Sequence, residues 1–180
     1  RKIGIAESDF KVLKQIWSHS NLSKQFKAEI FSVCIIQKLL YALEGAWINK
    51  IGQRRLDAFQ NRCLRRILGI APAFVNHITN ASVLNQFSAH PLHVTLLERQ
   101  LLYFGHIARA DKDSVLRCCA FKEKFDIDEP DKKRGRPRDT WTRKLLQHAI
   151  NIATDIDSLQ ACIDNKQEWK IKVRKYCRAT

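Results

Sequence analysis

Apolar residues recur at three- and four-residue intervals along almost the whole chain, with little of the alternation that marks β-strands. The clearest case is the segment 55–70, whose apolar stripe consists of Leu56, Phe59, Cys63 and Ile67. Such a stripe predicts an amphipathic helix that buries one face. Because the same pattern continues on both sides of this segment, the sequence predicts an all-α fold.

The same predicted helix carries a second, basic stripe. Arg55, Arg62 and Arg66 fall together on another side, Arg65 lies beside them, and Gly69 supplies a stop. Guanidinium groups bind phosphate in bidentate geometry, so a helix of this kind is suited to lie along a phosphate backbone. The alternative is a solvated basic face without a ligand.

The charge of the whole chain favours a polyanionic partner. Its 180 residues include 32 Lys and Arg against 18 Asp and Glu, a formal net charge of +14. Residues 1–70 alone carry 13 basic and 5 acidic side chains. Such an excess attracts polyanions through long-range fields and counterion release, and nucleic acid is the first partner to consider. Lys24 and Lys27, near the start of a second predicted helix, could add phosphate contacts.

The helical pattern and its breaks predict four parts. Three helices are expected over residues 8–19, 24–41 and 52–68, with Ser23 as the N-cap of the second. Their short connections predict a three-helix bundle. The expected parts are a helical bundle over 1–70, a helical connector over 71–125, a charged linker over 126–139 and C-terminal helices over 140–180.

The expected linker ends in a basic Gly-Arg-Pro loop. Its positive side chains are Arg134, Arg136 and Arg138, separated by Gly135 and Pro137. A slim, extended, cationic segment of this kind can enter the narrow minor groove of A·T-rich DNA. The alternative is a solvated basic loop that precedes a helix.

The four tryptophans raise the question of base stacking. Trp17 and Trp169 share apolar stripes with neighbouring residues, which favours a place in the core. Trp141 lies next to the Gly-Arg-Pro loop, and its role stays open.

The sequence contains no convincing catalytic or metal site. The six acidic residues among the first 110 never form a tight pair, so a two-metal carboxylate site has no candidates there. His90 and His93, like Cys118 and Cys119, do not complete a spacing that closes a tetrahedral zinc site. We therefore expect no catalytic residue, metal ligand or cofactor in this chain.

Composition also bears on cellular location. No apolar run approaches the roughly 20 residues that span a bilayer, and nothing at the N-terminus resembles a secretory signal. We expect an intracellular, nuclear protein without a membrane partner, whose six cysteines are reduced thiols and mostly lie in the core. The chain begins at Arg1 and contains no Met, so we expect a piece of a longer protein.

Five short motifs, in this order and spacing, resemble the part of non-LTR (LINE-type) retrotransposon polyproteins that follows the polymerase palm. They span nearly the whole chain. They are Ile16-Trp17 with Asn21-Leu-Ser, Leu39-Leu-Tyr41 with Glu44 and Trp47, Arg55-Leu-Asp-Ala-Phe with Arg62-Cys-Leu-Arg-Arg-Ile-Leu-Gly69, Glu98-Arg-Gln-Leu with Phe104-Gly-His106, and Arg134-Gly-Arg-Pro137 with Trp141.

The resemblance implies that residues 1–70 form the thumb of a reverse transcriptase, which holds the template–primer duplex, and that residues 71 onward form the connector. The catalytic aspartates and their Mg²⁺ would lie in the palm of the parent RNA-directed DNA polymerase, so this chain would not be an enzyme by itself. Its partners would be an RNA–DNA hybrid, or the backbone of DNA or RNA, and the palm and fingers of the parent.

Three hypotheses follow from the sequence. The first is a thumb and connector that grips nucleic acid without reading its sequence. The second is a free-standing DNA-binding module that places Arg136 and its neighbours in the minor groove. The third is a helical protein-interaction module whose positive charge is incidental and does not bind nucleic acid. The resemblance favours the first.

Overall fold

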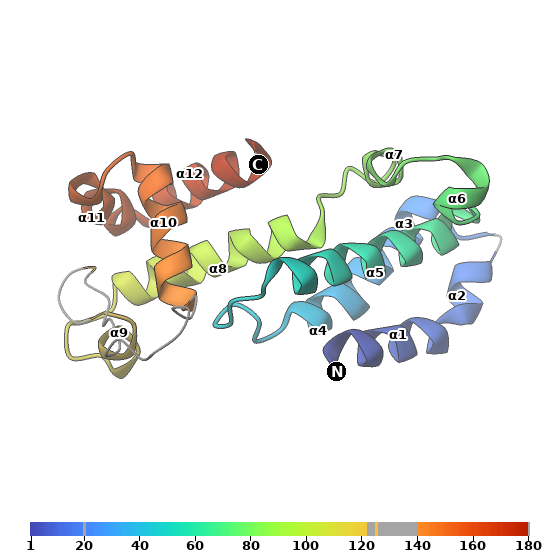
Figure 1. The fold of residues 1–180 in the computed structure, drawn as a ribbon. Helices are drawn as coiled ribbons and strands as arrows, with labels where there is room; N and C mark the ends of the chain where they lie inside the picture. Colours follow the sequence, from blue (N-terminus) through green and yellow to red (C-terminus); the bar gives the residue numbers. More distant parts are fainter. Residues whose placement is uncertain (20, 122–124, 126–139, 180) are drawn as a thin grey trace, which may run out of the picture. The chain divides into compact units, whose positions relative to one another are not determined.

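The computed structural model describes residues 1–19, 21–121, 125 and 140–179. Every regular element within these residues is a helix, so the expected all-α class is confirmed (Figure 1). The expected Gly-Arg-Pro loop, with Arg134, Arg136 and Arg138, lies outside the described residues.

The chain divides into two compact units. Unit 1 comprises residues 1–41 and 48–95, and unit 2 comprises residues 42–47 and 96–180. The boundary expected after residue 70 therefore falls inside unit 1, and the segment 42–47 belongs to unit 2 although it precedes most of unit 1.

Unit 1 begins with a helix that starts earlier than the sequence pattern indicated. We expected it over 8–19, but it starts at Lys2 and is interrupted at Leu13, where φ is −82° and ψ is 18°. The second expected helix continues from residue 24 to residue 40 but includes a π-helical segment. The elements are α1 (Lys2–Val12), α2 (Lys14–Ser18), α3 (Lys24–Ile30), η1 (Phe31–Ile36), α4 (Gln37–Leu40), α5 (Lys50–Leu68), α6 (Ala73–Asn76) and α7 (Asn80–Asn85).

Helix α5 is the centre of unit 1, because α1, α2, α3 and α7 all contact it. Aromatic rings connect these helices. Phe31 lies 5.8 Å from Phe10 and 6.1 Å from Phe59, measured between ring centroids. Trp17 stacks on Phe10 at 4.8 Å, and its indole N–H donates to the Phe10 carbonyl. The prediction that Trp17 belongs to the core is confirmed.

Local capping fixes both ends of α5. The Asn49 side chain accepts a hydrogen bond from the Gly52 N–H at 2.8 Å and caps the first turn. At the other end Gly69 adopts the left-handed conformation with φ of 71°, which glycine enters without steric penalty. The N–H groups of Gly69 and Ile70 then donate to the carbonyls of Arg66 and Arg65, as in a Schellman motif. The stop predicted at Gly69 is confirmed.

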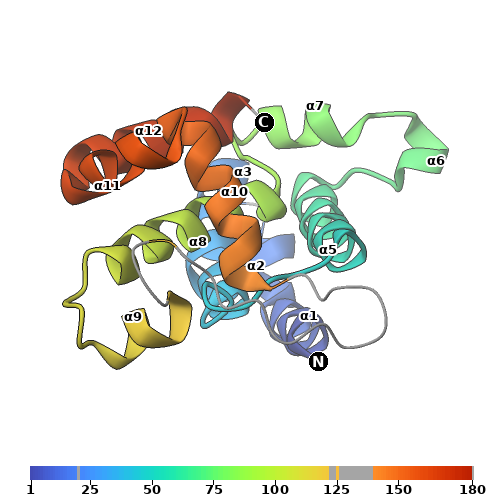
Figure 2. The same cartoon turned by 60° about the vertical axis from the view of Figure 1, so that its left-hand side comes forward.

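Unit 2 contains most of α8 and the C-terminal helices. Helices α10, α11 and α12 contact one another, and Figure 2 shows them together in orange and red. The sequence analysis did not predict α9 or α11, which are both short. The elements are α8 (Leu92–Ala108), α9 (Val115–Ala120), α10 (Trp141–Ala153), α11 (Ile156–Asp164) and α12 (Lys166–Ala179).

Two tryptophans tie unit 2 together through their indole N–H groups. Trp169 is 1% exposed and donates to the Leu101 carbonyl at 3.1 Å, which confirms its predicted place in the core. Trp141 is half-buried and donates to the Glu44 carbonyl at 2.7 Å. Its ring also packs against Tyr103 at 5.9 Å. The indole N–H left open for a ligand is therefore used inside unit 2.

Candidate functional site

Helix α5 separates an apolar face from a basic one. The predicted apolar stripe is buried, because Leu56, Phe59, Cys63 and Ile67 are each at most 5% exposed. Arg55, Arg62 and Arg66 are exposed, and we call these three residues the arginine stripe. Burial of the apolar face fixes the rotation of α5 and therefore the direction in which the arginine stripe points.

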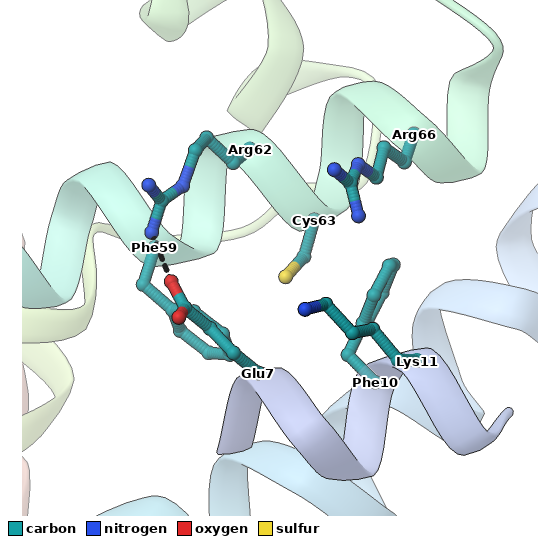
Figure 3. A pocket seen from close by; sticks show the side chains of 7 residues that line it. All are labelled: Glu7, Phe10, Lys11, Phe59, Arg62, Cys63 and Arg66. Carbon is teal, nitrogen blue, oxygen red and sulfur yellow. Dashed lines mark hydrogen bonds and ion pairs between the residues drawn. The ribbon is translucent and has the colours of Figure 1, made fainter. Parts of the chain in front are cut away.

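A pocket lies where the arginine stripe meets α1. Its volume is about 210 Å³, and we call it the α1–α5 pocket. Figure 3 shows the Arg62 and Arg66 guanidinium groups and the Lys11 ammonium group around the same opening. The lining residues are Glu7, Phe10, Lys11, Phe59, Arg62, Cys63 and Arg66.

Charges in the pocket are only partly compensated. The Arg62 guanidinium donates to the Glu7 carboxylate in an ion pair that remains exposed to solvent. In the part of the chain that the structure describes, the side chains of Lys11 and Arg66 have no hydrogen-bond or ion-pair partner. Two cations thus share one opening without an anion between them.

The floor of the pocket is apolar. Phe10, Phe59 and Cys63 are nearly fully buried, at 4%, 0% and 5% exposure. Burial raises the pKa of the Cys63 thiol to about 12, although Arg62 and Arg66 act to lower it. Because desolvation outweighs the attraction of two guanidinium groups, the thiol is neutral at physiological pH and adds no negative charge.

Arg65 does not belong to the basic surface, contrary to the prediction. It is 5% exposed, and its guanidinium donates to the carbonyls of Ala71 and Ile78 and to the Asn80 side chain. These bonds fasten the segment after α5 back onto the helix. Arg65 lies one residue before Arg66, about 100° around the helix, and that rotation turns it toward α7.

Lys27 is also removed from the surface. Its side chain is buried, and the ammonium group donates to the Trp17 carbonyl at 2.9 Å near the end of α2. Lys24, one helical turn earlier, is exposed. Of the nine positions predicted to bind nucleic acid, the structure thus leaves Lys24, Arg55, Arg62 and Arg66 accessible, buries Lys27 and Arg65, and does not describe Arg134, Arg136 and Arg138.

Sequence reasoning missed Glu7 and Lys11. The predicted first helix began at Ser8, so Glu7 fell outside it, and Lys11 lay inside it but was not singled out. Their spacing of four residues is the sequence signal that could have identified them. Residues four apart share a helix face, so a helix starting at Lys2 puts both beside Phe10 on the face that packs against α5.

A histidine–carboxylate pair in unit 1 has a structural explanation. The Asp57 carboxylate accepts from the backbone N–H of His93 at 3.1 Å and lies 2.7 Å from its ring nitrogen Nδ1. Gln60 accepts from the Leu92 N–H and donates to the His90 carbonyl. Side chains of α5 therefore cap the first turn of α8, which otherwise has unpaired N–H groups.

Cysteines and other metal-ligating side chains form no cluster in the described ranges. All six cysteines are free thiols, but only Cys63, Cys162 and Cys177 are buried, fewer than expected. No three His, Cys, Asp or Glu side chains of residues 1–19, 21–121, 125 and 140–179 come close enough to hold a metal ion. Within those same ranges, no helix has the length and apolarity that crossing a membrane requires.

Comparison with known proteins adds no relative. The chain matches no protein-family model, no curated protein and no solved structure.

Proposed function

We propose that this chain grips nucleic acid through phosphate contacts, as the thumb and connector of a non-LTR (LINE-type) retrotransposon reverse transcriptase. The observation that carries the proposal is the arginine stripe, which is exposed on a helix whose opposite face is fixed in the core of unit 1. The net charge of +14 supports a polyanionic ligand, and the five sequence motifs support the choice of parent protein.

The dimensions of α5 suit a nucleic-acid backbone. Arg55 and Arg66 are eleven residues apart, which corresponds to roughly 16 Å along a helix. Phosphates of one strand advance about 3.4 Å along a duplex axis, so the stripe covers a stretch of roughly five. Side chains that contact phosphate position a duplex without selecting its sequence, as a moving template–primer requires.

The proposal divides the work between this chain and its parent. The chain supplies phosphate contacts from the arginine stripe and Lys24, with Arg134, Arg136 and Arg138 as further candidates. Polymerase chemistry and Mg²⁺ belong to the palm of the parent, so the chain is not an enzyme by itself. Its partners are the duplex and the palm and fingers domains, in the nucleus.

The test is binding of the purified chain to an RNA–DNA hybrid, duplex DNA and single-stranded RNA between 50 and 200 mM salt. If about four cations contact phosphates, the slope of log K against log salt is about −3 to −4, and affinity falls by about two decades. Changing Arg62 and Arg66 together to Gln reduces the magnitude of the slope by about two. Two fewer phosphates are neutralised, so fewer counterions are released on binding.

The matched control is a double variant on the same helix. Lys50→Gln with Arg54→Gln removes the same charge from exposed positions of α5 outside the arginine stripe, and we expect a much smaller change. Absence of salt-dependent binding by a chain with a native circular dichroism spectrum would overturn the proposal and favour a protein-interaction module. Preference for A·T tracts that Arg136→Ala abolishes would favour the minor-groove module instead.

A further inference from the structure

The α1–α5 pocket concentrates positive charge around one small volume. Lys11, Arg62 and Arg66 bring three cations to its rim and Glu7 brings one carboxylate, a net charge of +2. A water molecule occupies about 30 Å³ in the liquid, so a pocket of about 210 Å³ accommodates a group of several heavy atoms. The pocket therefore differs from the position of Arg55, the third member of the arginine stripe, which is exposed and does not line the pocket.

The three cations of the pocket differ in whether they have a partner. The Glu7 carboxylate holds one end of the Arg62 guanidinium, which fixes its direction at the rim. Figure 3 shows the Lys11 ammonium group and the Arg66 guanidinium facing the same space above Cys63. Neither has a hydrogen-bond or ion-pair partner among the described residues, so an anion bound in this space would gain charged contacts with both.

The apolar floor strengthens the attraction of an anion. Phe10 and Phe59 close the bottom of the pocket and limit the water that would otherwise screen the charges. Cys63 stays a neutral thiol there, because burial raises its pKa to about 12. The floor thus offers no competing negative charge, and Glu7 is already engaged by Arg62.

We propose that the α1–α5 pocket binds one phosphate monoester, and that its source is the terminal phosphate of a nucleic-acid strand. A monoester carries about −1.5 to −2 at neutral pH and presents three free oxygens, whereas an internal phosphodiester carries one charge. The net charge of +2 and the three donors match the monoester. Arg66 suits bidentate contact and Lys11 a single charged contact. The choice of a strand end rests on the proposed function.

The first experiment locates the site with inorganic phosphate. Phosphate is titrated into the isotopically labelled chain against chloride at equal ionic strength, and the backbone amide signals are followed by NMR. We expect shifts at Lys11, Cys63 and Arg66, and none of comparable size at Arg54 or Lys50. Shifts scattered over all basic residues, or none at the pocket, would overturn the proposal.

The second experiment identifies the source. One duplex is prepared with a 5′-phosphate and with a 5′-hydroxyl, and the affinities are compared at 100 mM salt. We expect the phosphorylated duplex to bind about tenfold more tightly, since charge-assisted hydrogen bonds are involved. Lys11→Gln with Arg66→Gln reduces this ratio to below about twofold, while the control pair Lys50→Gln with Arg54→Gln retains it.

The outcomes separate this inference from the proposed function. Salt-dependent binding of the 5′-hydroxyl duplex tests only the proposed function, which is binding of nucleic acid through its backbone phosphates. The strand-end inference is overturned if the two duplexes bind with equal affinity, or if Lys11→Gln with Arg66→Gln leaves the affinity ratio unchanged. The proposed binding of backbone phosphates is not affected by either result. If inorganic phosphate shifts the NMR signals of the pocket residues but the chain binds neither duplex, the pocket binds free phosphate. That outcome overturns both the strand-end inference and the proposed binding of nucleic acid.

Discussion

The arginine stripe of unit 1 and two arginines of unit 2 use their guanidinium groups differently. In unit 1 the arginine stripe is exposed, and Lys11 joins it at the α1–α5 pocket. In the described part of unit 2, by contrast, Arg109 donates to the Ile163 carbonyl at 2.8 Å and Arg117 donates to the carbonyls of Ala108 and Ala110. Cations of the first kind are available to a ligand, whereas those of the second kind fasten backbone segments.

The difference teaches that the position of a cation, and not the number of cations, decides whether it can bind a partner. Within unit 1, Arg65 and Lys27 resemble Arg109 and Arg117, because both donate to backbone carbonyls, and both are buried. A buried guanidinium with several carbonyl partners cannot leave them without exposing unpaired acceptors. The net charge of the chain therefore overstates the charge that a polyanion would meet.

The largest effect we predict is at Gly105 in unit 2. A Cβ atom at this position would lie 2.4 Å from Nε1 and 2.7 Å from Cδ1 of Trp169, and that ring is fixed in the core. We expect Gly105→Ala to lower the free energy of unfolding by about 3 kcal/mol, because neither the ring nor α8 can move apart cheaply. Urea denaturation followed by tryptophan fluorescence measures the change.

Gly4 in unit 1 is the matched control for that substitution. It also lies in a helix, but a Cβ atom there would have nothing within 4 Å. We expect Gly4→Ala to stabilise the chain by about 0.5 to 1 kcal/mol, through higher helix propensity alone. If both variants changed stability by similar amounts, the close contact of α8 with Trp169 would not be the cause.

A second prediction separates two neighbouring arginines. Arg65→Met should lower the free energy of unfolding by about 2 kcal/mol, because it leaves the Ile78 carbonyl and its neighbours without a donor. Arg66→Met should change it by less than about 0.5 kcal/mol, since Arg66 is exposed. Thermal unfolding followed by circular dichroism measures both.

Nucleic-acid binding is expected to rank the two variants in the opposite order. Arg66→Met weakens binding and lowers its salt dependence, whereas Arg65→Met leaves both unchanged at a temperature where the variant is folded. Equal loss of binding in the two variants would contradict the division between exposed and buried arginines on α5.

The sequence was most informative where one helix had a strong pattern. The buried stripe of α5, the exposure of Arg55, Arg62 and Arg66, and the stop at Gly69 were all predicted correctly. Capping residues were equally reliable. Ser23, predicted as an N-cap, accepts a hydrogen bond from the Phe26 N–H. These features depend on periodicity and on hydrogen bonds between neighbours, which a single sequence contains.

Features that depend on contacts between distant segments could not be predicted in this way. The burial of Arg65 requires the chain to return after Gly69 and offer the Ile78 carbonyl, and no spacing in the sequence announces that return. The α1–α5 pocket likewise requires two helices that are about 50 residues apart in sequence to pack together. Periodicity identifies the face that is buried, but not the side chains that meet across it.

A third effect on stability concerns the thiol at the floor of the α1–α5 pocket. Burial raises the pKa of Cys63 from 9.0 to about 12, so the folded chain keeps the thiol neutral at a pH where the unfolded chain ionises it. The resulting stability is fully present below about pH 9 and is lost as the pH rises toward 12. At pH 10 the loss is about 1 kcal/mol relative to neutral pH.

The measurement is the free energy of unfolding at pH 7 and pH 10 for the native chain and for Cys63→Ala. Cys177 in unit 2, whose pKa burial raises to about 11, contributes equally to both proteins and cancels in the difference. Cys63→Ala should therefore lose about 1 kcal/mol less than the native chain between the two pH values. An identical loss in both would mean that the pocket floor admits enough water to solvate a thiolate, and it would remove the low-polarity surface beneath Lys11 and Arg66.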